Sequence, residues 1–222
     1  MIQRIKNIRA VIFDAGGVIV RTEERAPRDQ LAARLGLPRD ELNRLVFDSE
    51  SAQLATVGKM TTQAHWEVTR QALNLSEEAF AAVPEDFFGG DIIDMELVNY
   101  IRGLRSHYRT ALLSNAWDNL RQALESRWKI ADAFDVLIIS AEVRLAKPDP
   151  EIYRVTLDRL GVAANEAIFV DDFLRNIEAA QAVGIHAVQF RNIEQALADV
   201  EQILNDESSR PDPSPDHLRV PA

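Results

Sequence analysis

Residues 10–17, Ala-Val-Ile-Phe-Asp-Ala-Gly-Gly, decide the fold class. Four consecutive apolar residues that end in a carboxylate and two glycines are typical of a buried strand breaking into a tight loop. The segment therefore predicts a first strand over Ala10–Phe13, with Asp14 at its carboxyl end. Basic residues precede it, but the apolar stretch stops at Asp14 and lacks a small-residue cleavage site, so we expect a first strand and not a signal peptide.

Strand and helix patterns alternate after residue 90. The predicted strands are Thr110–Leu113, Val136–Ser140, Ala167–Val170 and His186–Phe190. Helical periodicity separates them at 95–108, Trp117–Lys129, Glu151–Leu160 and Asn176–Val183. Such alternation predicts an α/β fold, with right-handed crossovers and a mainly parallel sheet covered by helices on both faces.

The stretch from Glu23 to Phe88 follows a different pattern. Its apolar residues recur at spacings of three and four, and Thr61 or Thr62 and Ser76 stand where helix N-caps are expected. We expect a small all-helical cap domain over 22–89, inserted into a core domain made of 1–21 and 90–204. The Pro- and Ser-rich segment 205–222 is expected to be a flexible tail.

Polar residues close three of the predicted strands. Asp14 ends the first, Ser114 ends the second, and the pair Asp171-Asp172 ends another. Ligands of parallel sheets sit at the carboxyl ends of the strands, so we expect these groups to converge. Lys147 lies in Ala-Lys-Pro-Asp-Pro, where Asp149 can cap a helix beginning at Pro150 and so fix the lysine beside them. Each feature alone is common in turns and at helix caps, but the four in this order together predict a single functional site.

Four segments carry a resemblance to the haloacid dehalogenase superfamily, in the subgroup with a helical cap between the first and second motifs. They are VIFDAGGVIV at 11–20, ALLSNA at 111–116, AKPDPEIY at 146–153 and IFVDDFLRNIEAAQAVGI at 168–185. The resemblance runs from about Val11 to Leu204. It implies a Rossmannoid core and a phosphatase that acts through an aspartyl phosphate.

The resemblance also implies residue roles. Asp14 would be the nucleophile and a ligand of Mg²⁺, with the backbone carbonyl of Gly16 and the carboxylate of Asp172 completing the metal site. Ser114, Asn115 and Lys147 would bind the substrate, with Ser114 and Lys147 on the phosphoryl oxygens. Asp171 and Asn176 would support the ligands from outside the metal's coordination. Magnesium favours such hard oxygen ligands together with substrate phosphate.

One position departs from the pattern. Most phosphatases of the superfamily carry a second aspartate, a general acid and base, where this chain has Gly16. A positioned general acid or base contributes roughly 10² to 10⁴ in rate. Relatives with glycine at this position include sugar-phosphate phosphatases, so a sugar phosphate is our first expectation for the substrate.

Three alternatives remain open. L-2-haloacid dehalogenases also lack the second aspartate, but their fourth motif typically has neutral residues where this chain has Asp171-Asp172. Phosphonoacetaldehyde hydrolases need a cap lysine for a Schiff base, and Lys59 is the only lysine in the predicted cap. A noncatalytic binding protein could keep the fold without the reaction.

The composition of the chain limits the classes of molecule that it is expected to bind. The charge of −10 disfavours nucleic acid and anionic membranes, and no apolar run is long enough to span a bilayer. Without cysteine, disulfides and thiolate chemistry are excluded. We expect a cytoplasmic protein, monomeric or homodimeric, whose partner is a small phosphorylated metabolite.

Overall fold

The computed structural model describes residues 8–205. Of the predicted tail at 205–222, only Asn205 falls within this range, where it ends a helix, and 206–222 lie outside the described residues. Within 8–205 no helix has the length and apolar character needed to cross a membrane.

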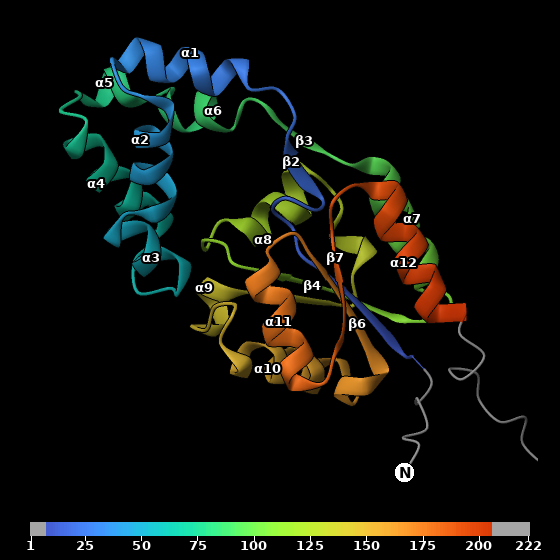
Figure 1. Cartoon of the computed structure of the whole chain (residues 1–222). Coiled ribbons are helices and arrows are strands. Elements are labelled where there is room, and N and C mark those ends of the chain that lie inside the picture. Colours follow the sequence, from blue (N-terminus) through green and yellow to red (C-terminus); the bar gives the residue numbers. More distant parts are fainter. Residues whose placement is uncertain (1–7, 206–222) are drawn as a thin grey trace, which may run out of the picture.

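A five-stranded parallel sheet forms the core of the fold (Figure 1). Its strands are β1 (Ala10–Phe13), β4 (Arg109–Ser114), β5 (Val136–Ile139), β6 (Ala167–Asp171) and β7 (His186–Gln189). They lie in the order β5-β4-β1-β6-β7, and every neighbouring pair is parallel. This confirms the predicted α/β class. Every predicted strand of the core is present, with ends shifted by at most one residue.

Successive side chains of β1 point to opposite faces of the sheet and pack into two hydrophobic layers. Val11 and Phe13 pack in one buried cluster with α7 (Met95–Leu104) and α12 (Ile193–Asn205). Ala10 and Ile12 pack in another with α10 (Pro150–Leu160) and α11 (Leu174–Val183). Helices therefore cover both faces of the sheet, as predicted.

The helix predicted over Trp117–Lys129 is shorter and irregular. It begins as α8 (Leu120–Gln122) and continues as a π-helical turn over Ala123–Arg127. Trp117 and Asp118 stay outside it because they contact the helices of 26–88 instead. The remaining short elements are 3₁₀ turns at Ala131–Ala133 and Ala164–Glu166, and α9 (Ser140–Val143).

Residues 26–88 fold into helices with a hydrophobic cluster of their own, and we call them the cap. The helices are α1 (Ala26–Leu35), α2 (Arg39–Asn43), α3 (Glu50–Thr56), α4 (Thr62–Ala72), α5 (Glu77–Phe80) and α6 (Val83–Phe88), with a π-helical turn at Arg44–Asp48. The hydroxyls of Thr61 and Ser76 accept from the N–H groups of Ala64 and Ala79, which confirms the predicted N-caps. The exact domain boundaries stay a prediction.

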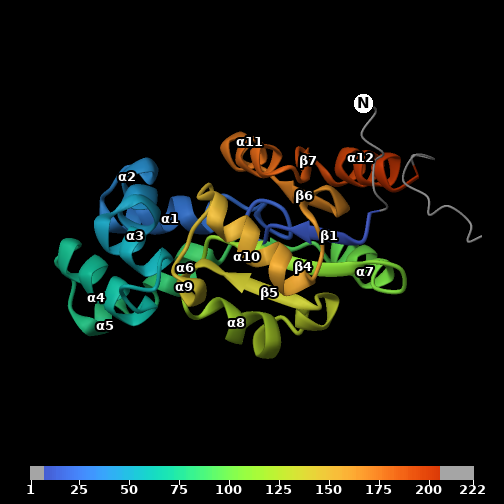
Figure 2. The ribbon, with the colours of Figure 1, turned by 90° about the horizontal axis from the view of Figure 1, so that it is seen from below.

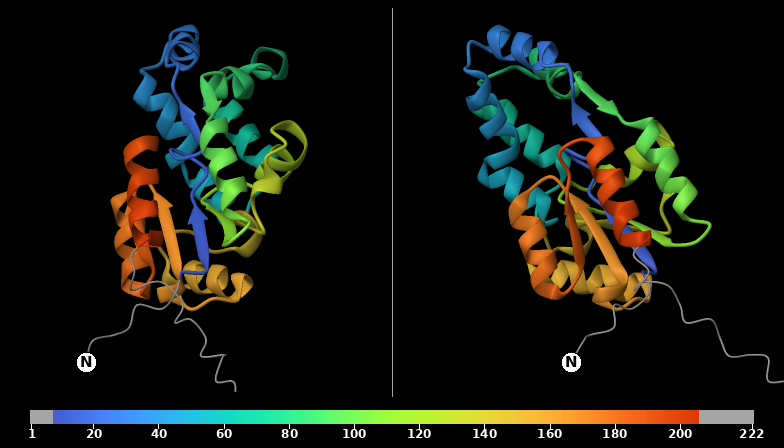
Figure 3. Two further views of the ribbon diagram at one scale, coloured as in Figure 1. Left: turned by 90° about the vertical axis from the view of Figure 1, so that its right-hand side faces the viewer. Right: turned by 45° about the vertical axis from the view of Figure 1, so that its right-hand side comes forward.

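A two-stranded antiparallel ribbon, absent from the prediction, joins cap and core. β2 (Val20–Thr22) pairs with β3 (Asp91–Ile93), and Figure 3 shows both strands between the cap and the sheet. Both chain connections to the cap pass through this ribbon. Three-residue strands carry too few side chains to show an alternating pattern, which is why the sequence did not indicate them.

Candidate active site

The carboxyl ends of β1, β4 and β6 meet at the centre of the sheet. β1 pairs with β4 on one side and with β6 on the other, so the chain changes direction across it. Ligands of open α/β sheets bind at such a switch point. In Figure 2 the strand arrows point toward the cap, which places this edge on the cap side of the sheet.

Lys147 joins two carboxylates at this edge. Its Nζ lies 2.9 Å from Oδ1 of Asp14 and 2.6 Å from Oδ2 of Asp171. The side chains of Lys147 and Asp171 are fully buried, and that of Asp14 is 8% exposed. Oδ1 of Asp14 also accepts from the N–H of Ala15 at 2.7 Å. Within the described chain, Oδ2 of Asp14 makes no hydrogen bond and is the oxygen left for other chemistry.

The loop that carries Lys147 is held on two sides. Asn115 accepts from the N–H of Lys147 and donates to its carbonyl, both at 2.8 Å. Asp149 accepts from the N–H of Glu151 and caps α10, whose first residue is Pro150, as predicted. The side chain of Asn115 thus positions the lysine, and its predicted role in substrate binding stays a prediction.

Ser114 ends β4 beside these groups. It is buried, and its hydroxyl makes no hydrogen bond to any residue in 8–205. A free hydroxyl at this edge of the sheet can donate to an anionic ligand.

Asp171 and Asp172 are adjacent but have different surroundings. Asp171 accepts from the N–H of Phe173 at 2.8 Å and from the amide of Asn176 at 3.0 and 3.1 Å, in addition to Lys147. By contrast, the buried Oδ1 of Asp172 has no hydrogen-bond partner within the described residues. An unsatisfied buried oxygen is costly. Asp172 is therefore the carboxylate of the pair that is free to bind a cation.

The loop after β1 brings Asp172 close to the backbone. Gly17 has φ +77°, and a Cβ built on it would lie 2.3 Å from Oδ2 of Asp172. Only glycine fits there without displacing the carboxylate. Gly16 is exposed, and a Cβ built on it would have no heavy atom within 4 Å.

Burial and charge shift two pKa values in this cluster. Burial raises the pKa of Asp14 from 3.8 to about 7, against the attraction of Lys147. Burial and then the charge of Asp171 raise the pKa of Asp172. Oxygens of Asp14, Asp171 and Asp172 lie within 4.8 Å of one another, and Lys147 forms ion pairs with Asp14 and Asp171. Three carboxylates and one ammonium group leave excess negative charge, and the free oxygen of Asp172 fits a hard divalent cation such as Mg²⁺.

The sequence did not indicate the aromatic contact between core and cap. Trp117, three residues after Ser114, packs against His65, Trp66 and Phe47 of the cap at centroid distances of 4.7, 5.7 and 6.3 Å. The short step from Ser114 to Trp117 was the one available signal. These three cap residues come from segments whose placement relative to Trp117 no local pattern encodes.

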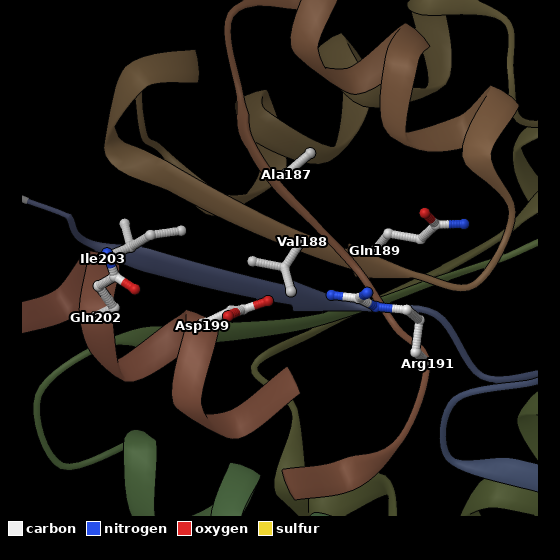
Figure 4. A pocket seen from close by; sticks show the side chains of 7 residues that line it. All are labelled: Ala187, Val188, Gln189, Arg191, Asp199, Gln202 and Ile203. Atoms are coloured by element: carbon white, nitrogen blue, oxygen red, sulfur yellow. The ribbon is translucent and has the colours of Figure 1, made fainter. Parts of the chain in front are cut away.

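A separate pocket of about 310 Å³ lies between β7 and α12 (Figure 4). Its lining residues include Val188, Arg191, Asp199 and Ile203. It contains none of the residues predicted to act in catalysis, so the chemistry is expected at the carboxylate cluster instead.

Known proteins resemble the chain over most of its length. The profile of the haloacid dehalogenase-like hydrolase family matches residues 8–184. Bifunctional epoxide hydrolase 2 of Sus scrofa is 27% identical over 216 residues, but they span 88% of this chain and only 39% of that protein. (S)-2-haloacid dehalogenase 1 of Pseudomonas sp. (strain CBS-3) is 26% identical over 196 residues, 84% of this chain and 86% of that protein.

A phosphatase and a solved structure also resemble this chain over most of its length. Validoxylamine A 7'-phosphate phosphatase of Streptomyces hygroscopicus subsp. limoneus is 28% identical over 204 residues, covering 89% of this chain and 93% of that protein. A HAD family enzyme of Bacteroides thetaiotaomicron, crystallised with magnesium and inorganic phosphate, superposes with a TM-score of 0.68 at 21% identity. That superposition covers 82% of this chain and 94% of the other, and it shows a shared fold.

Proposed function

The chain belongs to the haloacid dehalogenase-like hydrolase family, and from this premise we propose that it is a magnesium-dependent phosphatase of small phosphate monoesters. The observation that carries the proposal is the cluster of Asp14, Asp171 and Asp172 around Lys147. Such a cluster suits a cation and the phosphate that a cation attracts. The similarity to a phosphatase over 93% of its length supports the same reading.

Magnesium would be held by the carboxylates of Asp14 and Asp172 and by the carbonyl of Gly16. Asp171 is the weaker candidate because Lys147, Phe173 and Asn176 already occupy its oxygens. When bound, the ion lowers the repulsion between Asp14 and an anionic phosphate and stabilises charge on the phosphoryl oxygens.

Asp14 would act as the nucleophile. A bond forms from its free Oδ2 to phosphorus, and the bond from phosphorus to the leaving oxygen breaks, with the electron pair going to that oxygen. Water then attacks phosphorus and releases phosphate, which restores the carboxylate. Ser114 and Lys147 would donate hydrogen bonds to the phosphoryl oxygens as charge develops on them.

The leaving oxygen needs a proton, and Gly16 has no side chain to supply one. Esters of acidic alcohols or phenols should therefore react faster than simple alkyl esters. A sugar phosphate, our first expectation, is an alkyl ester. Its sugar oxygen would leave slowly, or with the help of another proton donor. The substrate partner is in either case a small phosphorylated metabolite. A cytoplasmic location and a monomer or homodimer belong to the same proposal.

A 2-haloacid dehalogenase activity is the main alternative, given the similarity to (S)-2-haloacid dehalogenase 1. A haloacid carries its own carboxylate, which would have to approach three others balanced by the single ammonium group of Lys147. The free oxygen of Asp172 makes that arrangement unfavourable without a cation. Phosphonoacetaldehyde chemistry is less favoured still, because Lys59 is exposed, whereas Schiff-base lysines are typically desolvated.

The test is phosphate release from p-nitrophenyl phosphate, sugar phosphates and nucleotides, with Mg²⁺ or with a chelator. We expect activity to need Mg²⁺ and to fall by at least about a thousandfold in Asp14→Asn, which removes the nucleophile but keeps the side-chain size. Halide release from L-2-chloropropionate is measured in parallel. Release of halide without release of phosphate would replace the proposal by the dehalogenase alternative, and release of neither would favour a noncatalytic binding role.

A further inference from the structure

An aromatic cluster links the cap to the core next to the carboxylates. We define it as Phe47, His65, Trp66, Phe87, Phe88 and Trp117. Phe47 packs edge-on against Phe87 at 5.2 Å and Phe88 at 6.1 Å, and lies 6.3 Å from Trp117. Trp117 is the member from the core, and the others come from the cap.

Trp117 ties this cluster to the active site. It follows Ser114 by three residues, so the backbone between them spans at most about 10 Å. The cap is anchored at the same place. Ser140, directly after β5, donates to the carbonyl of Thr56 in α3 at 2.6 Å, and its hydroxyl accepts from the N–H of Ala116 at 2.9 Å. The aromatic cluster therefore stands above the carboxyl end of β4.

Phe47 is only partly covered by its neighbours. It is 46% exposed although it contacts three other rings, and Phe88 and Trp117 are half-buried. On the core side, Phe173 and Leu174 directly follow Asp172 and are 52% and 54% exposed. Apolar surface is thus available on the core within two residues of Asp172, and on the cap at Phe47, which reaches the site through its contact with Trp117.

The cluster offers few groups that could bind hydroxyls or anions. The guanidinium of Arg28 lies 5.8 Å from the ring of Phe47 and 4.1 Å from that of Phe87. Its Nε donates to the carbonyl of Phe87, and its Nη2 donates to the side chains of Thr22 and Asp91. Nδ1 of His65 is paired with Ser51 at 2.8 Å, and its Nε2, which has no hydrogen-bond partner among the described residues, belongs to a fully buried side chain that a leaving group does not reach.

We propose that Phe47 and Trp117 form a subsite for the leaving group, and that it selects phosphate esters of hydrocarbon or aromatic alcohols over sugar phosphates. An apolar leaving group would cover the exposed ring of Phe47. The hydroxyls of a sugar placed there would lose water and meet mainly ring carbons, with the indole N–H of Trp117 as one donor for several hydroxyls. This inference rests on the phosphatase function proposed above and narrows its substrate class.

The test is a series of n-alkyl phosphates, ethyl, butyl and hexyl, with glucose 6-phosphate beside them. All four are primary alkyl esters, so the leaving oxygen is chemically alike and only the contacts of the leaving group change. We expect kcat/KM to rise by roughly fourfold for each methylene that becomes buried. Glucose 6-phosphate should react no faster than ethyl phosphate.

Phe47→Ala should flatten this series, so that the ratio of hexyl to ethyl phosphate falls at least fivefold. Phe47→Leu, which keeps an apolar side chain, should restore part of the ratio. Val68→Ala is the matched control, because Val68 is an exposed apolar residue of the cap that lies outside the cluster. Its ratio should equal that of the wild type. Inhibition by inorganic phosphate reports whether each variant keeps its phosphate site.

The outcomes separate the two proposals. If no ester releases phosphate, the phosphatase function fails. If esters react but the wild-type series is flat, or glucose 6-phosphate reacts fastest, the leaving-group subsite is wrong while the phosphatase function stands. A Phe47→Ala variant that slows all four esters by the same factor would also overturn the subsite.

Discussion

At residue 16 the chain lacks a side chain where the structure has room for one. A Cβ built on Gly16 meets no heavy atom within 4 Å, and the backbone there is not in the left-handed region. An aspartate can therefore be introduced without a clash. Its carboxyl group would stand two residues from Asp14, on the side of the loop that faces solvent.

We predict that Gly16→Asp raises kcat for alkyl phosphates by about tenfold to a hundredfold, because it adds a general acid for the leaving oxygen. p-Nitrophenyl phosphate, whose leaving group needs no proton, should gain much less. Gly16→Asn provides the same shape without the acid. Equal rates for the aspartate and asparagine variants would show that residue 16 does not take part in proton transfer.

Hydrogen bonding separates two residues that the strand pattern alone leaves equivalent, and it ranks them in the same order as the family resemblance. Both Asp171 and Asp172 follow a buried strand, so the pattern predicts an acidic pair without ranking its members. In the structure, Asp171 is saturated by Lys147, Phe173 and Asn176, whereas Oδ1 of Asp172 has no partner in 8–205. The difference arises from residues 24 positions upstream and 5 downstream, which no local pattern relates to the pair.

At the scale of elements, the loop after β1 depends on Gly17. Its N–H donates to the carbonyl of Val20 at 2.9 Å, which closes the turn. Its φ of +77° and the 2.3 Å approach of Asp172 to the position of a Cβ both exclude other residues. Gly36, which ends α1, has a similar φ of +68° but no heavy atom within 4 Å of its Cβ position.

We predict that Gly17→Ala lowers the affinity for Mg²⁺ and the activity by at least tenfold, because the new methyl group displaces Asp172. Gly36→Ala imposes a similar backbone cost of about 1 kcal/mol but leaves the site untouched. The Gly36→Ala variant should therefore be less stable than the wild type but equally active. Magnesium titration by calorimetry and thermal unfolding of both variants measure the two effects. Equal loss of activity in the two variants would mean that backbone strain alone is responsible.

The elements differ in how far the sequence predicts them. The strands of the core and the N-caps at Thr61, Ser76 and Asp149 are encoded locally, by apolar runs and by a side chain next to its own helix. The β2–β3 ribbon and the contact of Trp117 with the cap depend on residues far apart in the chain. Because their strands are parallel, the sequence also predicts that the candidate site residues lie near one edge of the sheet. It does not predict which carboxylate oxygens are hydrogen-bonded and which are free.

At the scale of the whole molecule, the active site lies where two separately packed units meet. Residues 26–88 have their own hydrophobic cluster, and the sheet has two more. Arg21 in the connecting ribbon pairs with Asp94 at 2.7 Å and with Glu23 at 3.0 Å, which fixes the start of α7 beside β2. A movement of the cap away from the core would bend this ribbon and break the hydrogen bonds of Thr56 with Ser140 and of Thr62 with Asp118.

Burial of the carboxylate cluster connects global stability to pH and to magnesium. In the folded protein the pKa of Asp14 is raised from 3.8 to about 7, so the folded state holds this proton more tightly than the unfolded state. The resulting contribution to stability is fully present below pH 3.8 and is lost as pH rises through about 7. Magnesium binds the ionised carboxylate, so its own stabilising effect changes in the opposite direction.

We therefore predict that Mg²⁺ raises the unfolding temperature more at pH 8 than at pH 5.5. At a hundredfold excess over Kd, a ligand stabilises by about 2.7 kcal/mol, or roughly 5–10 °C for a chain of this size. At pH 5.5 protonation of Asp14 competes with the metal, and the gain should be clearly smaller. Thermal unfolding with Mg²⁺ and with chelator at both pH values measures the difference. In Asp14→Asn residue 14 cannot ionise, so Mg²⁺ should raise the unfolding temperature only slightly and with little pH dependence. If Mg²⁺ raised the unfolding temperature of the wild type equally at both pH values, the metal would not bind at Asp14.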